Sequence, residues 1–190
     1  MTKRPYTGGD DERLLVEKIR KGDRNAMSML YRKYIGSLSS VCHRYLAVDD
    51  DAKDVLQDSF LKILMQMDKF SYNGDGSLRA WMTRIVVNRS LNFLRDRSRL
   101  NMMLKGNLSS QEVAADEPDV ELISPDELHL LIRQLPDGYR TVLNLYVFEN
   151  YSHREIAQLL GIKESSSSSQ LHHAKALLAK KIREFRKEKE

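Results

Sequence analysis

Apolar residues recur at spacings of three and four along nearly the whole chain, and no long alternation of apolar and polar residues interrupts them. That spacing is typical of one face of an α-helix, whereas alternation would indicate a β-strand. Leu15 and Ile19 mark a first amphipathic helix, which should end at Gly22 with Asp23 as the N-cap of the next. We therefore predict an all-α protein, whose second helix has Ala26, Leu30 and Tyr34 on one face.

A further helix is predicted from Asp50, with two faces of opposite character. Its acidic face carries Asp51, Asp54 and Asp58, which recur at helical spacing. Carboxylates near a helix N-terminus are favoured by the helix dipole, so this face has a purely structural explanation. A docking surface for a basic partner helix explains it equally well. The apolar stripe opposite consists of Val55, Leu56, Phe60, Ile63, Leu64 and Met67.

The stretch "FSYNGDGS" reads as a turn, because Gly74 and Gly76 allow backbone conformations that other residues avoid. A long helix should follow, from Ser77 or Leu78 to about Arg97. Its polar stripe could coat phosphates through arginine and read base edges through asparagine. It could also be an ordinary solvated face. The stripe consists of Arg84, Asn88, Asn92 and Arg95.

Between Leu100 and Ser124 the helical periodicity fades, and acidic residues together with Pro118 take over. This composition is that of a linker. We expect two small helical domains, residues 1–99 and 124–190, joined by a flexible acidic linker over residues 100–123.

The C-terminal part predicts a helix-turn-helix. Helices should start at Ser124 with Pro125, at Pro136 with Asp137, and at the capping box "SHRE", Ser152 to Glu155. The third of these helices ends at Gly161, and five consecutive serines, 165–169, follow shortly after.

Serine is a poor helix former, so the serine run could be a flexible linker. If it is helical, one buried stripe should form, and four of its five members are apolar: Ser167, Leu171, Ala174, Leu178 and Ile182. We therefore predict a helix with Ser165 as its N-cap. The opposite side would present small polar groups to a DNA major groove: Ser165, Ser166, Ser168, Ser169, His172 and His173. The adjacent histidines fit groove or phosphate contacts better than zinc ligation, because neighbouring residues on a helix point apart.

Composition narrows the possible classes of protein. The net charge of +4 is compatible with nucleic acid, and the arginines crowd residues 79–99. Cys42 is the only cysteine, so no disulfide within the chain is expected, and neither a metal nor a cofactor. No phosphate loop, HExxH motif or nucleophile elbow supports an enzyme. No apolar run approaches the roughly 18 residues that span a bilayer, and no signal peptide is evident, so we expect a soluble, cytoplasmic protein without membrane insertion.

Four stretches in order carry a resemblance to a known family: "DAKDVLQDSFLKI", "GSLRAWMTRIVVNRSLNFLR", "LPDGYRTVLNLYVFENYSHREIAQLLGI" and "SSSQLHHAKALL". Over nearly everything from Asp11 to Phe185, the chain resembles a bacterial RNA polymerase sigma factor of the compact extracytoplasmic-function group. The resemblance implies a promoter-specificity subunit, not an enzyme, that binds core RNA polymerase and promoter DNA and assists melting. A stand-alone helix-turn-helix regulator is the alternative, but such a regulator has no need of the N-terminal half.

The resemblance also implies roles for individual residues. The β′ clamp helices of the polymerase would bind Asp51, Asp54, Gln57, Asp58 and Phe60. The −10 element would be contacted by Tyr72, Asn73 and Asp75 around a flipped base, and by Trp81, Arg84, Asn88 and Arg95. The −35 element would be contacted by Arg140, Tyr151, Ser166, Ser168, Ser169, His172 and His173. The polymerase β flap and an anti-sigma factor are further partners that it implies, and the free protein should be monomeric.

The serine run departs from the family. Members commonly have a Gly-Thr pair and one or more arginines or lysines in this turn, and an arginine where this chain has His173. Guanidinium groups make bidentate guanine contacts worth about 1–3 kcal/mol each. We therefore expect weak, salt-sensitive −35 recognition with an altered base preference, and stronger contacts below a pH of about 6.5, where exposed histidines become charged.

Overall fold

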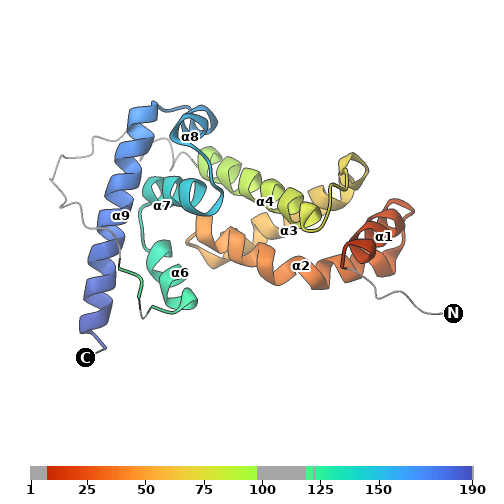
Figure 1. Cartoon of the computed structure of the whole chain (residues 1–190), viewed down its shortest axis with the longest axis horizontal. Helices are drawn as coiled ribbons and strands as arrows, with labels where there is room; N and C mark the ends of the chain where they lie inside the picture. Colours follow the sequence, from red (N-terminus) through yellow and green to blue (C-terminus); the bar gives the residue numbers. More distant parts are fainter. Residues whose placement is uncertain (1–7, 98–118, 122, 190) are drawn as a thin grey trace. The chain divides into compact units, whose positions relative to one another are not determined.

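The computed structural model describes residues 8–97, 119–121 and 123–189, and all regular structure within these ranges is helical. The all-α prediction is therefore confirmed. The chain divides into two compact units, Met1–His43 with Val48–Ser90, and Arg44–Ala47 with Leu91–Glu190. Figure 1 labels the helices of both units. Most of the predicted linker, namely residues 100–118 and 122, lies outside the described residues.

The first unit contains α1 (Gly8–Arg20), α3 (Asp49–Met65), the short 3-10 helix η1 (Met67–Lys69), and most of α2 (Arg24–Tyr45) and α4 (Ser77–Asp96). The break between α1 and α2 is the predicted one. Gly22 has a φ of 80°, and the Asp23 carboxylate accepts hydrogen bonds from the N–H groups of Asn25 (2.8 Å) and Ala26 (3.2 Å). These bonds satisfy two donors that the start of α2 would otherwise leave free.

One face of each helix forms the core of the first unit. The predicted face of α2 is buried, and so is the apolar stripe of α3 except for Leu64, which is half-exposed. The sequence periodicity therefore identified the core side of both helices. The core includes Leu15, Ile19, Ala26, Leu30, Tyr34, Val55, Phe60, Ile63, Met67, Leu78, Met82 and Val86.

The second unit contains α6 (Pro125–Arg133), α7 (Asp137–Leu143), the π-helix η2 (Asn144–Phe148), α8 (His153–Leu160) and α9 (Glu164–Lys187). The helices α7 and α8 both pack against α9 (Figure 1). The predicted capping box at the start of α8 is present: the Ser152 hydroxyl accepts from the Glu155 N–H (3.3 Å), and the Ser152 N–H donates to the Glu155 carboxylate (2.8 Å). A second capping box, at Ser124 and Glu127, opens α6.

The serine run is helical along its whole length, and the predicted stripe from Ser167 to Ile182 is buried at all five positions. The prediction of Ser165 as the N-cap is wrong. The N-cap is Lys163, because the Ser167 N–H already donates to the Lys163 carbonyl (3.1 Å) and Glu164 begins α9. The serines therefore lie within the helix, and Gly161, with a φ of 69°, ends α8 as predicted.

Candidate nucleic-acid and protein interfaces

The acidic side of α3 is exposed, and it continues into apolar side chains. Asp54, Gln57 and Asp58 are exposed, and so are Leu61 (57% accessible) and Met65 (83%), which follow at helical spacing. We call these five residues the α3 outer face. Asp58 forms an ion pair with Arg89 of α4, so part of its charge is neutralised. The sequence analysis missed Leu61 and Met65, although they are apolar residues that fall off the predicted core stripe.

Asp51 and Phe60, which we also expected to contact a polymerase, are buried. The Phe60 ring packs against the ring of Tyr31 on α2, with centroids 4.9 Å apart. Because they are buried, neither side chain belongs to the α3 outer face. Phe60 lies on the predicted apolar stripe, so its burial follows from the helical periodicity.

The loop before α4 is held by its own polar groups. The Tyr72 hydroxyl donates to the Asp75 carboxylate (2.9 Å), the Asn73 N–H donates to the Ser77 hydroxyl (3.2 Å), and that hydroxyl donates to the Gly74 carbonyl (2.7 Å). Gly74 and Gly76 have φ angles of 104° and 79°, which only glycine adopts without strain. Asn73 and Asp75 are exposed, and Tyr72 is half-exposed. The three predicted loop residues therefore lie together in one ordered turn.

The entry to this loop is fixed to α1 and to α4. The Arg20 guanidinium donates to the carbonyls of Met67 (3.2 Å) and Phe70. The buried Phe70 ring packs against the half-exposed ring of Trp81, with centroids 5.3 Å apart. Sequence reasoning did not anticipate the role of Arg20, because it depends on two helices that are distant along the chain.

The predicted polar stripe of α4 is exposed at Arg84, Asn88, Asn92 and Arg95. Trp81 lies one turn before Arg84 on the same helix face. An indole ring next to guanidinium and amide groups can stack on an unpaired base while the polar groups bind its backbone. The loop leads directly into α4 at Ser77, and Trp81 lies between the loop and Arg84, the first residue of the stripe, along the helix.

The predicted DNA-facing residues of α9 differ in how exposed they are to solvent. Ser168, Ser169 and His172 are exposed, whereas Ser166 and His173 are half-buried. The His173 ring stacks on the ring of Tyr139 from α7, with centroids 5.9 Å apart and an interplanar angle of 21°. Tyr139, which the sequence analysis did not identify, therefore orients one of the predicted contacts.

Two polar side chains of α9 face the interior of the second unit. Ser167 is fully buried, and its hydroxyl lies 3.0 Å from Nδ1 of His153, the first residue of α8. Gln170 is buried one turn later. The hydrogen bond between Ser167 and His153 ties the start of α8 to the first turn of α9, the two helices of the helix-turn-helix.

Arg140 was expected to contact the −35 element, but its side chain does not lie on the surface. It is buried, and its guanidinium donates to the carbonyls of Arg133 (3.1 Å) and Leu135 (2.6 Å) and pairs with the Asp137 carboxylate. An arginine in this position must leave these partners before it can reach DNA, so its place here is that of a structural clamp around the start of α7. Tyr151, also predicted to contact DNA, is half-exposed just before α8.

The described residues contain no group of three or more His, Cys, Asp and Glu side chains that could hold a metal ion. Cys42 is buried, and burial raises its pKa to about 12, so the thiol stays protonated at neutral pH. Among the described helices, none is long and apolar enough to cross a membrane.

Comparison with known proteins identifies the family. The family profile "Sigma-70 region 2" matches residues 30–100, and "Sigma-70, region 4" matches residues 126–178, so the two matches together span more than half of the chain. The chain belongs to the sigma-70 family. This sigma factor is of the extracytoplasmic-function type, and it is a promoter-specificity subunit.

Its relatives are distant but match over nearly full length. The ECF RNA polymerase sigma-E factor of Haemophilus influenzae is 25% identical, over 90% of this chain and 95% of the relative. The RNA polymerase sigma-H factor of Pseudomonas aeruginosa is 26% identical, over 94% and 97%. One similar solved structure is the co-crystal structure of the sigma factor RpoE with the anti-sigma factor NepR from Bartonella quintana. The match covers 82% of this sigma factor and 96% of the matched chain, with 18% sequence identity and a TM-score of 0.49.

Proposed function

We propose that this sigma factor divides promoter recognition between three segments: residues 1–99 bind core polymerase and the −10 element, residues 124–190 bind the −35 element, and residues 100–123 connect them. The α3 outer face docks on the β′ clamp helices of the polymerase. One observation carries this assignment, which is that Leu61 and Met65 are exposed beside the carboxylates of Asp54 and Asp58. Exposed apolar side chains bordered by charge are typical of a protein interface.

The loop and the polar stripe of α4 bind the −10 element in our proposal. Tyr72, Asn73 and Asp75 surround one extruded base, while Trp81 stacks and Arg84, Asn88 and Arg95 bind the unpaired strand. Extruding a base costs a few kcal/mol, so a surface that binds unpaired bases favours the melted state. The ordered loop supports this role, since its hydrogen bonds hold the polar groups together before DNA arrives.

The exposed side of α9 reads the −35 element in our proposal, through Ser168, Ser169 and His172, with Ser166, His173 and Tyr151 at its border. No arginine or lysine stands among these residues, which supports weak recognition of the −35 element, because the bidentate guanine contacts of arginine are missing. Promoter choice would then rest mainly on the −10 element. The polymerase β flap is the partner of the second unit, and an anti-sigma factor that covers these surfaces is the expected regulator.

The chain acts without catalysis, in the cytoplasm and as a monomer when it is free of polymerase. A non-catalytic role follows from its place as a DNA-recognition subunit, and a cytoplasmic location from that of the polymerase on which it acts. The stand-alone regulator is the weaker alternative, because the α3 outer face would then have no partner.

The docking assignment is tested by mixing the protein with active bacterial core polymerase and separating the complex by size exclusion. Asp54→Arg reverses a charge on the α3 outer face, whereas Glu17→Arg makes the same change on the exposed side of α1. We expect co-elution of the wild type and of Glu17→Arg, and its loss with Asp54→Arg. Equal co-elution of both variants would refute the α3 outer face as the docking surface, and no association of the wild type would favour the stand-alone regulator.

A further inference from the structure

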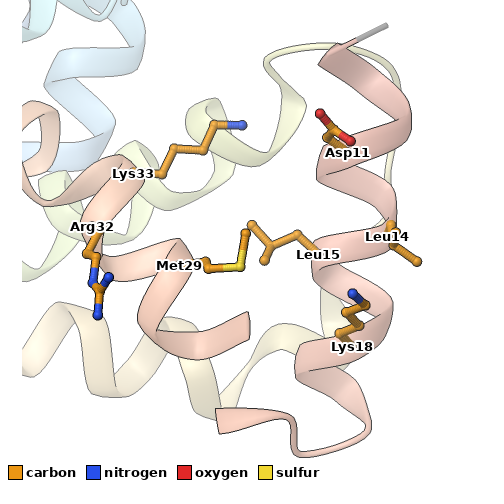
Figure 2. Close-up of a pocket in the computed structure, with 7 residues that line it drawn as sticks. All are labelled: Asp11, Leu14, Leu15, Lys18, Met29, Arg32 and Lys33. Carbon is orange, nitrogen blue, oxygen red and sulfur yellow. The ribbon is translucent and has the colours of Figure 1, made fainter. Parts of the chain in front are cut away.

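A cavity of about 630 Å³ lies between α1 and α2, in a part of the first unit to which no role has been assigned. Figure 2 shows Leu15 of α1 and Met29 of α2 pointing toward each other across it, with Lys33 reaching toward α1 on one side of this pair and Lys18 lying on the other. We call it the α1–α2 groove. Its lining consists of Asp11, Leu14, Leu15, Lys18, Met29, Arg32 and Lys33.

The apolar residues of the groove are partly uncovered. Leu14 is 47% accessible and Met29 is 62% accessible, whereas Leu15 beside them is buried. Folding of the first unit does not require Leu14 and Met29 to be apolar, because about half of the Leu14 surface and most of the Met29 surface stay in water. Methionine is flexible and polarisable, and for that reason it is common on surfaces that bind the apolar face of a partner helix.

The rim of the groove is basic. Lys18, Arg32 and Lys33 contribute three positive charges, against one negative charge from Asp11. Lys33 is partly neutralised by the Glu12 carboxylate, 3.3 Å away, but neither Lys18 nor Arg32 has an ion-pair partner among the residues that the structure describes. The groove therefore carries uncompensated positive charge next to exposed aliphatic side chains.

Lys33, on one side of this rim, is positioned by a buried carboxylate. The carboxylate of Glu12, which is buried, accepts a hydrogen bond from the Tyr34 hydroxyl as well as pairing with Lys33. Burial and the neighbouring Glu12 raise the pKa of Tyr34 well above its ordinary value, so the hydroxyl remains a donor at every physiological pH. Lys33 is thereby positioned before any partner binds, which lowers the entropy cost of binding.

We propose that the α1–α2 groove binds an amphipathic helix of a protein partner, whose apolar stripe contacts Leu14, Leu15 and Met29 and whose flanking carboxylates pair with Lys18 and Arg32. Charge complementarity selects an acidic partner. Single-stranded nucleic acid fits less well, because stacking of bases needs aromatic faces and none of the described residues that line the groove is aromatic. No lining residue belongs to the surfaces assigned above to polymerase or DNA, so this proposal stands independently of those assignments.

The test uses the full-length protein and a synthetic helical peptide with leucines spaced as i, i+4 and i+7 and glutamates beside them. A second peptide carries lysine in place of every glutamate. Binding is followed by fluorescence anisotropy and located by amide chemical shifts. We expect the acidic peptide to bind and to shift amides of α1 and α2, and the basic peptide not to bind.

Two double variants separate charge at the groove from charge in general. Lys18→Glu/Arg32→Glu should weaken binding of the acidic peptide at least about tenfold, which corresponds to about 1.4 kcal/mol. Lys180→Glu/Lys187→Glu makes the same change in net charge on exposed positions of α9 and should leave binding unchanged. Leu14→Ser/Met29→Ser, which changes only exposed side chains, should also weaken binding while the circular dichroism spectrum stays that of the wild type.

Any one of four results would overturn the proposal. The acidic peptide could fail to bind, it could bind equally well to Lys18→Glu/Arg32→Glu, or it could shift amides elsewhere in the chain. A single-stranded oligonucleotide that shifts the α1 and α2 amides and displaces the peptide would assign the groove to nucleic acid and would equally refute the proposal.

Discussion

The two exposed serines of α9 give a prediction in which stability and DNA binding change in opposite directions. Ser168 and Ser169 lie inside the helix, are exposed, and make no hydrogen bond to another described side chain. Alanine is a better helix former than serine by about 0.5 kcal/mol per position. The double variant Ser168→Ala/Ser169→Ala should therefore raise the free energy of unfolding by about 1 kcal/mol, which urea denaturation followed by circular dichroism measures.

The same change removes two hydroxyl groups from the proposed −35 surface. A neutral hydrogen bond contributes about 0.5–1.5 kcal/mol, so the two together are worth about 1–3 kcal/mol of binding. Affinity of the holoenzyme for a duplex promoter, measured by anisotropy at fixed salt, should fall between about fivefold and a hundredfold. A matched promoter whose −35 element has been scrambled should bind wild type and variant equally.

Ser167→Ala is the control within the same run. Ser167 is buried and bonded to His153, so the variant loses a hydrogen bond worth about 1 kcal/mol and regains about 0.5 kcal/mol of helix propensity. It should be less stable than the wild type by about 0.5 kcal/mol. If Ser167→Ala stabilises the protein as much as the exposed pair does, burial does not distinguish these serines and the reasoning is refuted.

Three further predictions concern single contacts. Arg20→Met removes charged hydrogen bonds to the carbonyls of Met67 and Phe70 and should lower the free energy of unfolding by about 1–2 kcal/mol. Amide exchange in the loop before α4 should become faster, and unchanged exchange would contradict the proposed role of Arg20 in holding this loop. Tyr72→Phe removes the bond to Asp75, and it should weaken binding of an unpaired −10 strand in a filter-binding assay without changing affinity for duplex DNA. Hydrogen bonds from Ser152 lower the pKa of Glu155 below its ordinary value of 4.5. The ionised Glu155 carboxylate therefore stabilises the folded protein above pH 4.5, and this stabilisation is lost as the pH falls through the folded-state pKa. The stability difference between wild type and Glu155→Gln should therefore shrink on acidification, and a constant difference would contradict this.

The helices could be predicted from the sequence because their local signals agree. Asp23 and the pair Ser152 and Glu155 cap the helices that they were expected to open, and Gly161 ends α8 in a left-handed conformation. The serine run was correctly assigned to a helix because the apolar positions after it fix the helical register. Its N-cap could not be predicted, since Lys163 caps α9 through its backbone alone.

The residues of the candidate site could be predicted where they lie on exposed helix faces. They could not be predicted where packing between helices determines whether a side chain is exposed. Arg84, Asn88 and Ser168 are exposed as expected, whereas Arg140 is buried among carbonyls at the start of α7. A local sequence pattern does not distinguish an arginine that binds DNA from one that holds a turn together. Tyr139 was missed for a similar reason, because its contact with His173 joins α7 to α9, two helices that are distant along the chain.

The guanidinium of Arg20 joins the last turn of α1 to the carbonyls of Met67 and Phe70, immediately before the loop proposed to receive the extruded base. Lys18, two residues earlier on α1, lines the α1–α2 groove. A ligand that shifts α1 changes the energy of the loop through this contact, and thermodynamic reciprocity requires the loop's ligand to change the affinity of the groove by the same factor. Binding of an unpaired −10 strand and occupation of the groove would then be linked by one coupling free energy.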